Sequence, residues 1–274
     1  MLILNDCLHI FSALLFLVLG IYFAYSRYAK APNAAFQTQE RIFIALPLLL
    51  QAIALAMAIF PDGKIMHFSV GIALAIIMWL AVFIYWLESF SARLEGLQPI
   101  ILLFAAACAL APILMPARYI VAYAHLPLFY LHFLVSIVAY SLLTLASIHA
   151  IFMGVAEQAL HRRVFVRHLS YLPPLLAMEK TLFHIIYAGF AFLCVALLTG
   201  VFFAEEVFGQ PLRLDHKTIF ALISWLTFAT LIFGRMRWGW RGRRALKWTL
   251  SGFVFLFLAY IGSRFVLEIL LNKI

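Results

Sequence analysis

The sequence predicts a polytopic α-helical membrane protein that crosses the bilayer about eight times, as one integral membrane domain over residues 1–274. Of its 274 residues, 66% are hydrophobic and 11% are charged. Soluble proteins carry roughly 45–50% apolar residues, so the excess is expected to face lipid. The apolar runs are about 20 residues long, enough to span a hydrocarbon core roughly 30 Å thick. They lack the period-two alternation of spanning β-strands, so helices are expected.

Proline and glycine mark the connections between the apolar runs. Pro61, Gly96 and Pro116 each fall where a helix is expected to stop or turn. Pro174 stands where a helix can begin, so the sixth helix has an alternative start one turn earlier than its apolar run. The expected helices span residues 7–26, 42–60, 66–87, 98–115, 126–153, 178–204, 218–234 and 247–270.

Positive charge gathers in alternate connections, which predicts the orientation. One set of connections holds fourteen Lys and Arg residues, and the opposite side holds five. Cytoplasmic loops carry the excess of Lys and Arg, so the side with fourteen is expected in the cytoplasm. Both termini are then expected on the outer side of the cell inner (plasma) membrane. The net charge of +9 therefore belongs to loops, and no nucleic-acid partner is expected. Asp6 and the absence of a basic start predict that the first run is retained as a helix.

Polar side chains recur on one face of the fifth expected helix. His132, Ser136, Tyr140 and Thr144 follow at every fourth position, so they share a face that is expected to point into the bundle. Ionisable groups at membrane depth cost about 2.5–3.5 kcal/mol on insertion scales, which makes each a functional candidate. Hydrogen bonding between helices is one explanation. For His132 the alternative is ligation of a metal, including haem iron.

His184 in the sixth expected helix is a second candidate, with Tyr187 one turn later. The two helices run in opposite directions, so roughly 15–20 Å of depth is expected between His132 and His184. One iron can bind both only if the sixth helix begins near Pro174. The other histidines are expected at interfaces or in loops, with His149 near the cytoplasmic end and a group near the outer ends: His9, His67, His125 and His216.

Two basic regions carry further candidates. The run 235–244 mixes arginines with two tryptophans, which is typical of a topology signal and of contact with anionic lipid, or of a partner site. Arg264 lies near the outer end of the last run. It is expected either to reach the headgroups or to pair with a carboxylate, which includes a haem propionate.

These residues resemble the cytochrome c assembly proteins, the group of CcsA, CcmC and HemX, over about residues 40–270. The likeness rests on 239–242 (Gly-Trp-Arg-Gly), 222–225 (Leu-Ile-Ser-Trp) and 215–217 (Asp-His-Lys). Leu131-His132 with Ala139-Tyr140 is similar to the helix in which that family places an external haem-ligating histidine. The stretch 178–184 (Met-Glu-Lys-Thr-Leu-Phe-His) is similar to the YpjD and HemX-like branch.

The sequence departs from the haem-handling members in its outer segment. Those members carry a Trp-rich segment ahead of the Asp and Lys, whereas residues 206–214 here contain no Trp. Phe233 stands where a cytoplasmic-side histidine would fall, and the second external histidine expected after Gly242 is missing. The resemblance therefore transfers His132 as an iron ligand, with His184 as the histidine of this branch.

Two functions follow as hypotheses. The first is a haem-binding or haem-handling membrane protein of the cytochrome c assembly superfamily, a carrier or assembly factor without covalent catalysis of its own. Haem b is its expected cofactor, with His132 and His184 as candidate metal ligands. The further candidate haem contacts are Tyr140, His216, Arg264 and Arg118.

The second hypothesis is a non-haem regulatory or scaffold protein that acts through a cytoplasmic partner. Expected partners are membrane lipids, haem, and other cytochrome c biogenesis or haem-synthesis proteins. A transporter is disfavoured because no inverted repeat is evident, and an enzyme because the apolar runs hold no paired carboxylates or nucleophile–base constellation.

Overall fold

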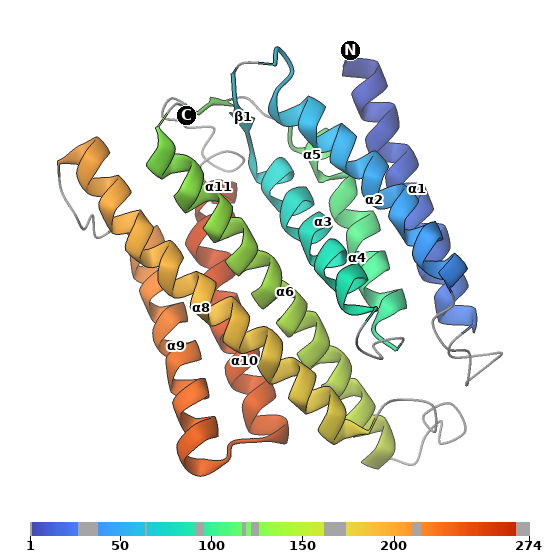
Figure 1. The fold of residues 1–274 in the computed structure, drawn as a ribbon, viewed down its shortest axis with the longest axis vertical. Helices are drawn as coiled ribbons and strands as arrows, with labels where there is room; N and C mark the ends of the chain where they lie inside the picture. The colour runs from blue at the N-terminus through green and yellow to red at the C-terminus, as the bar shows by residue number, and fades with distance from the viewer. Residues whose placement is uncertain are drawn as a thin grey trace.

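The computed structural model describes residues 2–26, 38–63, 65–90, 96–116, 119–121, 126–161, 174–209 and 215–266, which are almost entirely helical. Among these residues, seven helices are long and apolar enough to cross a membrane, and a shorter apolar helical stretch, Gln98–Leu114, accompanies them. The predicted eight-helix membrane bundle is confirmed. Helices α1 and α11 place the start and end of the described chain at the same end of the bundle (Figure 1).

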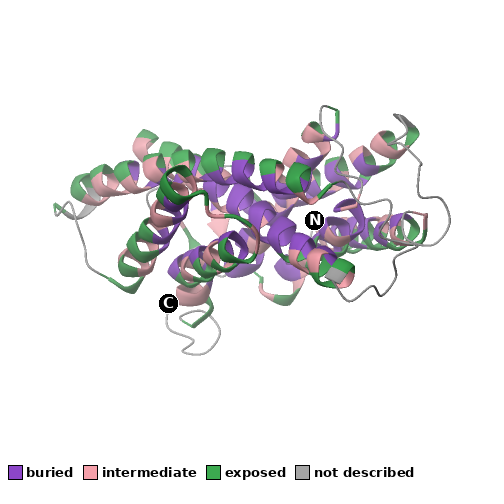
Figure 2. Ribbon diagram, turned by 90° about the horizontal axis from the view of Figure 1, so that it is seen from below, coloured by how far each residue is buried: buried purple, intermediate pink, exposed green. Residues whose placement is uncertain are grey.

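Two groups of helices pack side by side. The first consists of α1 (Leu2–Tyr25), α2 (Thr38–Ile59), α3 (Val70–Glu88) and α4 (Gln98–Ala109), continued by α5 (Ala111–Leu114). The second consists of α6 (Pro127–His161), α8 (Leu175–Phe208), α9 (His216–Trp238) and α10 (Gly242–Phe257). The π-helical turn η2 (Leu258–Gly262) and α11 (Ser263–Phe265) extend α10. Packing of α3 on α6 joins the groups, and buried residues line the space between the helices (Figure 2).

Helix α3 begins at Val70, four residues later than predicted. Strand β1 (His67–Phe68) pairs antiparallel with β2 (Tyr119–Ile120), so residues that were expected to be helical form an extended ladder. The hydroxyl of Ser69 accepts a hydrogen bond from the Ile72 N–H at 3.2 Å and donates to the Met115 carbonyl at 3.0 Å. An N-cap of this kind satisfies one of the free N–H groups of a first helical turn. It fixes the start of α3.

The fourth span is interrupted at Leu110, between α4 and α5. Pro112 has no backbone N–H and its ring crowds the carbonyl four residues earlier, so a helix cannot continue regularly through it. Gly71 of α3 packs against this break, because a Cβ at Gly71 would lie 2.3 Å from the Ala111 carbonyl oxygen. Close backbone approach at this point explains the glycine.

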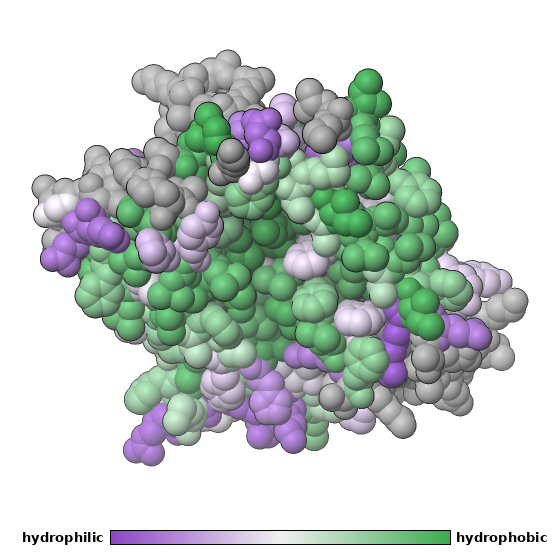
Figure 3. Space-filling model, turned by 45° about the horizontal axis from the view of Figure 1, so that its top comes forward, coloured by the Kyte–Doolittle hydropathy of each residue, from purple (hydrophilic) through white to green (hydrophobic). Residues whose placement is uncertain are grey.

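The long helices α6 and α8 exceed their predicted ranges. Helix α6 continues to His161 instead of residue 153, and α8 runs from Leu175 to Phe208 instead of 178–204, so the earlier start allowed by Pro174 is the observed one. Hydrophobic side chains cover the middle of the face in Figure 3, and hydrophilic side chains gather towards its edges. A belt of this kind is expected of a bundle surrounded by lipid.

Candidate functional site

The antiparallel pair of α6 and α8 builds the candidate site. The helices meet closely at Gly189, where a Cβ would lie 2.7 Å from the Leu143 side chain, and at Gly200, where it would lie 3.0 Å from the His132 ring. Small residues allow helices in membranes to approach one another closely. Close packing stabilises such helix pairs, because lipid provides no hydrophobic driving force between helices. The two glycines therefore fix the register that places His132 beside the outer part of α8.

The ring of His132 is held by α8 through one nitrogen. Its Nδ1 lies 3.1 Å from the Ala196 carbonyl oxygen and 3.2 Å from Thr199 Oγ1. A carbonyl can only accept, so Nδ1 carries the proton and donates. The Thr199 hydroxyl donates to the Val195 carbonyl at 2.8 Å, which leaves its oxygen free to accept. His132 thus presents Nε2 as the nitrogen with the available lone pair.

Nothing in the described chain occupies that second nitrogen. No hydrogen bond to His132 Nε2 is present among the described residues, and the ring is only partly buried. Metal-binding histidines usually donate their other N–H to a carbonyl or carboxylate, which fixes the tautomer and the ring orientation. The predicted inward orientation of His132 is observed, and its hydrogen bonds through Nδ1 leave Nε2 available.

Aromatic rings form a continuous row beside His132. The imidazole stacks on Phe203 with ring centroids 6.1 Å apart and an interplanar angle of 6°. Phe203 touches Phe129 at 5.8 Å, and Phe129 stacks on Phe133 at 5.7 Å. Phe133 meets Phe68 edge-to-face at 5.1 Å. These side chains come from β1, α6 and α8, and they line the outer end of the α6–α8 pair with apolar surface.

Tyr140 belongs to a different contact. Its hydroxyl donates to the Leu256 carbonyl at 2.9 Å, just before the π-turn of α10, and its ring meets Tyr260 at 6.4 Å. Tyr140 stands eight residues beyond His132, about 12 Å along α6. The shared face predicted for the two residues therefore serves two neighbours, α8 for His132 and α10 for Tyr140.

The structure separates His184 from His132. The ring of His132 lies against Thr199 and Gly200 of α8, and His184 is fifteen residues before Thr199 on the same helix, about 22 Å away along its axis. His184 is also exposed on the lipid side. One iron cannot bind both nitrogens, although α8 has the early start that a shared iron requires. The two histidines are therefore as far apart as the expected 15–20 Å or more, and the alternative of one shared iron does not fit this distance.

The remaining predicted contacts that the structure describes, His216 and Arg264, lie at the outer end. His216 is exposed at the start of α9, directly after the N-cap residue Asp215. Arg264 is partly buried in α11, and Arg118 lies outside the described residues. No hydrogen bond or ion pair joins His216 or Arg264 to His132 within the described ranges. Those ranges also hold no group of three His, Cys, Asp or Glu side chains suited to a metal ion.

The sequence of the chain is similar to those of known proteins over most of its length. The family model described as Cytochrome C assembly protein matches residues 7–271. The chain belongs to the cytochrome c assembly family. It is 28% identical over 244 residues to the inner membrane protein YpjD of Escherichia coli K12, which covers 87% of this chain and 90% of the relative. No solved structure matches it.

Shorter stretches of the chain match other relatives. An uncharacterized 28.8 kDa protein of Azospirillum brasilense is 34% identical over 142 residues, or 52% of each chain. The cytochrome c biogenesis protein CcsA of Trichormus variabilis is 36% identical over 94 residues, which is 33% of this chain and 27% of the relative. The predicted family and the multi-pass inner-membrane location are confirmed.

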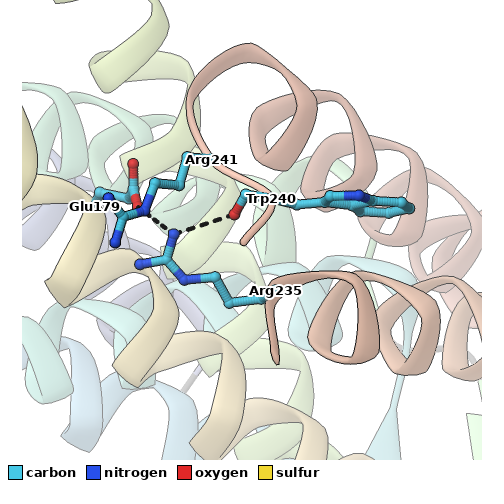
Figure 4. A network of polar contacts seen from close by, with 4 residues as sticks. All are labelled: Glu179, Arg235, Trp240 and Arg241. Carbon is cyan, nitrogen blue, oxygen red and sulfur yellow. Dashed lines mark hydrogen bonds and ion pairs between the residues drawn. The ribbon is translucent and has the colours of Figure 1, made fainter. Parts of the chain in front are cut away.

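A polar clasp at the other end of this family member was not predicted. Glu179 of α8 is buried and accepts a hydrogen bond from Arg235 at 2.5 Å, and Arg241 lies 3.5 Å away (Figure 4). Arg235 also donates to the Trp240 carbonyl at 3.1 Å and lies 4.4 Å over the Phe183 ring. The sequence did contain a signal for this contact, because Glu179 is a single carboxylate at the start of an apolar run and Arg235 and Arg241 lie in one basic run.

Two histidines expected at interfaces are buried instead. His9 has no exposed surface, and its Nδ1 lies 3.1 Å from the Gln51 amide nitrogen, beside Ser12. His149 is 1% exposed, and its Nε2 donates to the Met178 carbonyl at 2.9 Å. In both cases the partner comes from a distant part of the chain, so a single-helix pattern does not reveal it. Both predictions of an interfacial location are wrong.

Proposed function

We propose that this protein binds haem b at the outer end of the α6–α8 pair, with His132 Nε2 as an axial ligand of the iron. The observation that carries the proposal is the hydrogen bond from His132 Nδ1 to the Ala196 carbonyl. It fixes the tautomer in which Nε2 holds a lone pair, and it orients the ring. Bound haem would supply an iron that the Nε2 lone pair can coordinate.

The surroundings of His132 suit a flat apolar ligand. A porphyrin is planar and largely apolar, and aromatic rings contact such faces either edge-on or by offset stacking. The row formed by Phe203, Phe129 and Phe133 offers these contacts next to the imidazole. In this proposal the row takes the place of the tryptophans missing from residues 206–214.

A second axial ligand from the outer end fits the depths better than His184. The indole N–H of Trp225 in α9 lies 3.1 Å from the Cys194 sulfur in α8, which aligns the two helices. His216 is nine residues outward from Trp225, about 13 Å, and Thr199 is five residues outward from Cys194, about 7 Å. His216, at the outer start of α9, is therefore the second ligand in this proposal. Arg264 and Arg118 are proposed to hold the propionates.

The proposed role is that of a carrier or assembly factor in cytochrome c biogenesis. The chain's own residues would bind and orient the haem, and partner biogenesis proteins would receive or deliver it. No covalent step is assigned to this chain. Support comes from the family and from the cytochrome c biogenesis protein CcsA, which matches part of the chain.

An absorption spectrum of the purified protein, with and without added haem, tests the proposal. We expect a Soret band for the wild type, its loss in His132→Ala, and no change in His184→Ala, which replaces an exposed histidine of the same helix pair. His216→Ala is expected to change the spectrum to that of five-coordinate iron. A wild type that binds no added haem, or a His132→Ala variant that binds it equally, overturns the assignment.

A second candidate function is a scaffold that acts through a cytoplasmic protein. Its specific support is the inner end of α9, where Met236 is 77% exposed and Trp238 is 62% exposed beside Arg237. Large apolar side chains next to positive charge are enriched at protein interfaces. Co-purification of a partner that is lost on Met236→Ser and Trp238→Ser, with haem binding absent, favours this function over the first.

A further inference from the structure

A basic pocket lies at the start of α10, at the end of the bundle opposite to His132. Its volume is 310 Å³ and it is lined by Arg243, Arg244, Lys247 and Trp248. All four residues belong to the first two turns of one helix, and the three cations are exposed. The pocket is separate from the haem site and from the clasp around Glu179.

The charges around the pocket are only partly neutralised. Arg243 forms an ion pair with Glu157 of α6 at 3.1 Å, and Arg244 lies over the Trp240 ring at 5.3 Å. Three cations therefore face one carboxylate. No acidic residue occupies the first turn of α10, where the helix dipole adds further positive potential. An anion in the pocket would be attracted to all three side chains.

The same face of α10 turns apolar beyond the pocket. Residues 243, 247, 254, 257 and 258 fall within about 100° of one another at 100° per residue. Arg243 and Lys247 begin this face, and Val254, Phe257 and Leu258 continue it with exposed fractions of 53%, 39% and 37%. An exposed apolar stripe thus follows the charged residues on this face, beginning at Val254, seven residues or about 10 Å after Lys247. This is the profile of an amphiphile, with a head and a tail.

Tryptophan rings place the pocket at the membrane boundary. Trp238 stacks on Trp240 at 5.8 Å, and Trp240 meets Trp248 at 5.4 Å. Tryptophan is enriched at the level of the lipid headgroups. The positive-inside distribution assigns this end to the cytoplasmic side, where anionic lipids create a negative surface potential.

We propose that the pocket binds the phosphate of an anionic phospholipid, with the acyl chains lying along the apolar stripe of α10. Arg243, Arg244 and Lys247 bind the phosphate oxygens, and Trp248 packs against the glycerol region. The continuous stripe favours a lipid over free phosphate, which has no tail to cover it. The inference is independent of haem binding.

Native mass spectrometry of the full-length protein, delipidated in detergent and then given phosphatidylglycerol, tests the site. Each surface cation strengthens binding of anionic lipid about fivefold. We expect Lys247→Gln to weaken phosphatidylglycerol binding about fivefold, and Arg243→Gln with Lys247→Gln to weaken it about 25-fold. Phosphatidylcholine is expected to bind weakly to all variants. The single variant remains informative if loss of the Arg243 pair impairs folding.

The matched control is Arg237→Gln with Lys180→Gln, which removes the same charge from exposed positions outside the pocket. It is expected to bind phosphatidylglycerol as the wild type does. Equal loss in the control and the pocket variants overturns a specific site and leaves general surface charge as the cause. Displacement of the lipid by millimolar inorganic phosphate, or an effect of Lys247→Gln only on capture of an acidic protein, also overturns the proposal.

Discussion

Each end of the α6–α8 pair holds a histidine of α6 by a hydrogen bond to a backbone carbonyl of α8, but the two rings differ in burial. His132 at the outer end and His149 at the inner end both donate to a backbone carbonyl of α8, Ala196 and Met178 respectively. His149 is 1% exposed, and its remaining nitrogen is enclosed without a partner in the described chain. His132 remains partly exposed. A hydrogen bond to an α8 carbonyl, from Nε2 in His149 and from Nδ1 in His132, therefore accompanies a fully buried ring in one case and a partly exposed ring in the other.

The reason lies in what surrounds each ring. At the inner end, the acceptor Met178 directly precedes Glu179, whose buried carboxylate binds Arg235, and Arg235 also donates to the Trp240 carbonyl. At the outer end, Gly200 provides only a backbone surface next to His132. The exposure of a histidine in a membrane helix thus depends on its neighbours in the fold more than on its own position in the sequence.

The largest effect is expected from breaking the helix pair between its two ends. In Gly189→Leu, the new side chain would collide with Leu143, because a Cβ already falls 2.7 Å from that residue. Overpacking costs about 1–3 kcal/mol or more. Ala188→Leu places the same side chain on the exposed face and is the control. Thermal unfolding in detergent compares them, and equal stability of the two variants contradicts the observed register.

Removal of the inner carboxylate tests the clasp. Glu179→Gln leaves Arg235 and Arg241 without their anion, and loss of charged hydrogen bonds costs about 1.5–3 kcal/mol. Glu157→Gln is the matched control, since its partner Arg243 is largely exposed and such pairs contribute about 0–1 kcal/mol. Unfolding midpoints measure both. If Glu157→Gln destabilises as much as Glu179→Gln, burial is not what gives the clasp its strength.

The support behind His132 can be weakened without touching the ring. Thr199→Val keeps the shape but removes one of the two acceptors of Nδ1, so haem affinity is expected to fall up to about tenfold, the lower range for outer-shell changes. Thr227→Val removes a hydroxyl that also bonds four residues back, at 2.7 Å, and serves as control. Haem titration of both variants is the measurement, and equal affinities would argue against a supporting role for Thr199.

The smallest effect concerns the outer end of α9. Partial burial raises the pKa of Asp215, but hydrogen bonds from Thr218 and the charge of Lys217 outweigh it, so the pKa is lowered overall. Its contribution to stability is therefore present above the unfolded pKa of about 3.9 and is lost as pH falls through the lower folded value. Asp215→Ala is expected to cost about 0.5–1 kcal/mol at pH 7.

Unfolding midpoints of wild type and Asp215→Ala at pH 7 and pH 3 check this expectation. The difference between the two proteins should shrink at the lower pH, where the carboxylate becomes protonated. A difference that grows on acidification would contradict the direction of the pKa shift.

Hydropathy sufficed to predict the membrane helices and their number, because each span satisfies its own backbone and needs only its own apolar residues. The period of four along α6 also indicated that His132 points inward. The start of α3 was missed because β1 pairs with residues more than fifty positions later. The buried positions of His9 and His149 were missed for the same reason. They depend on which helices meet and in what register.

The π-turn of η2 gives the end of the α10 rod its own orientation. A π-turn closes hydrogen bonds over five residues instead of four, so it inserts one residue into an otherwise α-helical course. Every side chain beyond it is rotated by about 100° from the direction that an uninterrupted α-helix would give. Arg264 is the second residue after η2. Deletion of a single residue within Leu258–Gly262 would therefore move that guanidinium to another side of the helix, while the turns of α10 before Leu258 would stay in place.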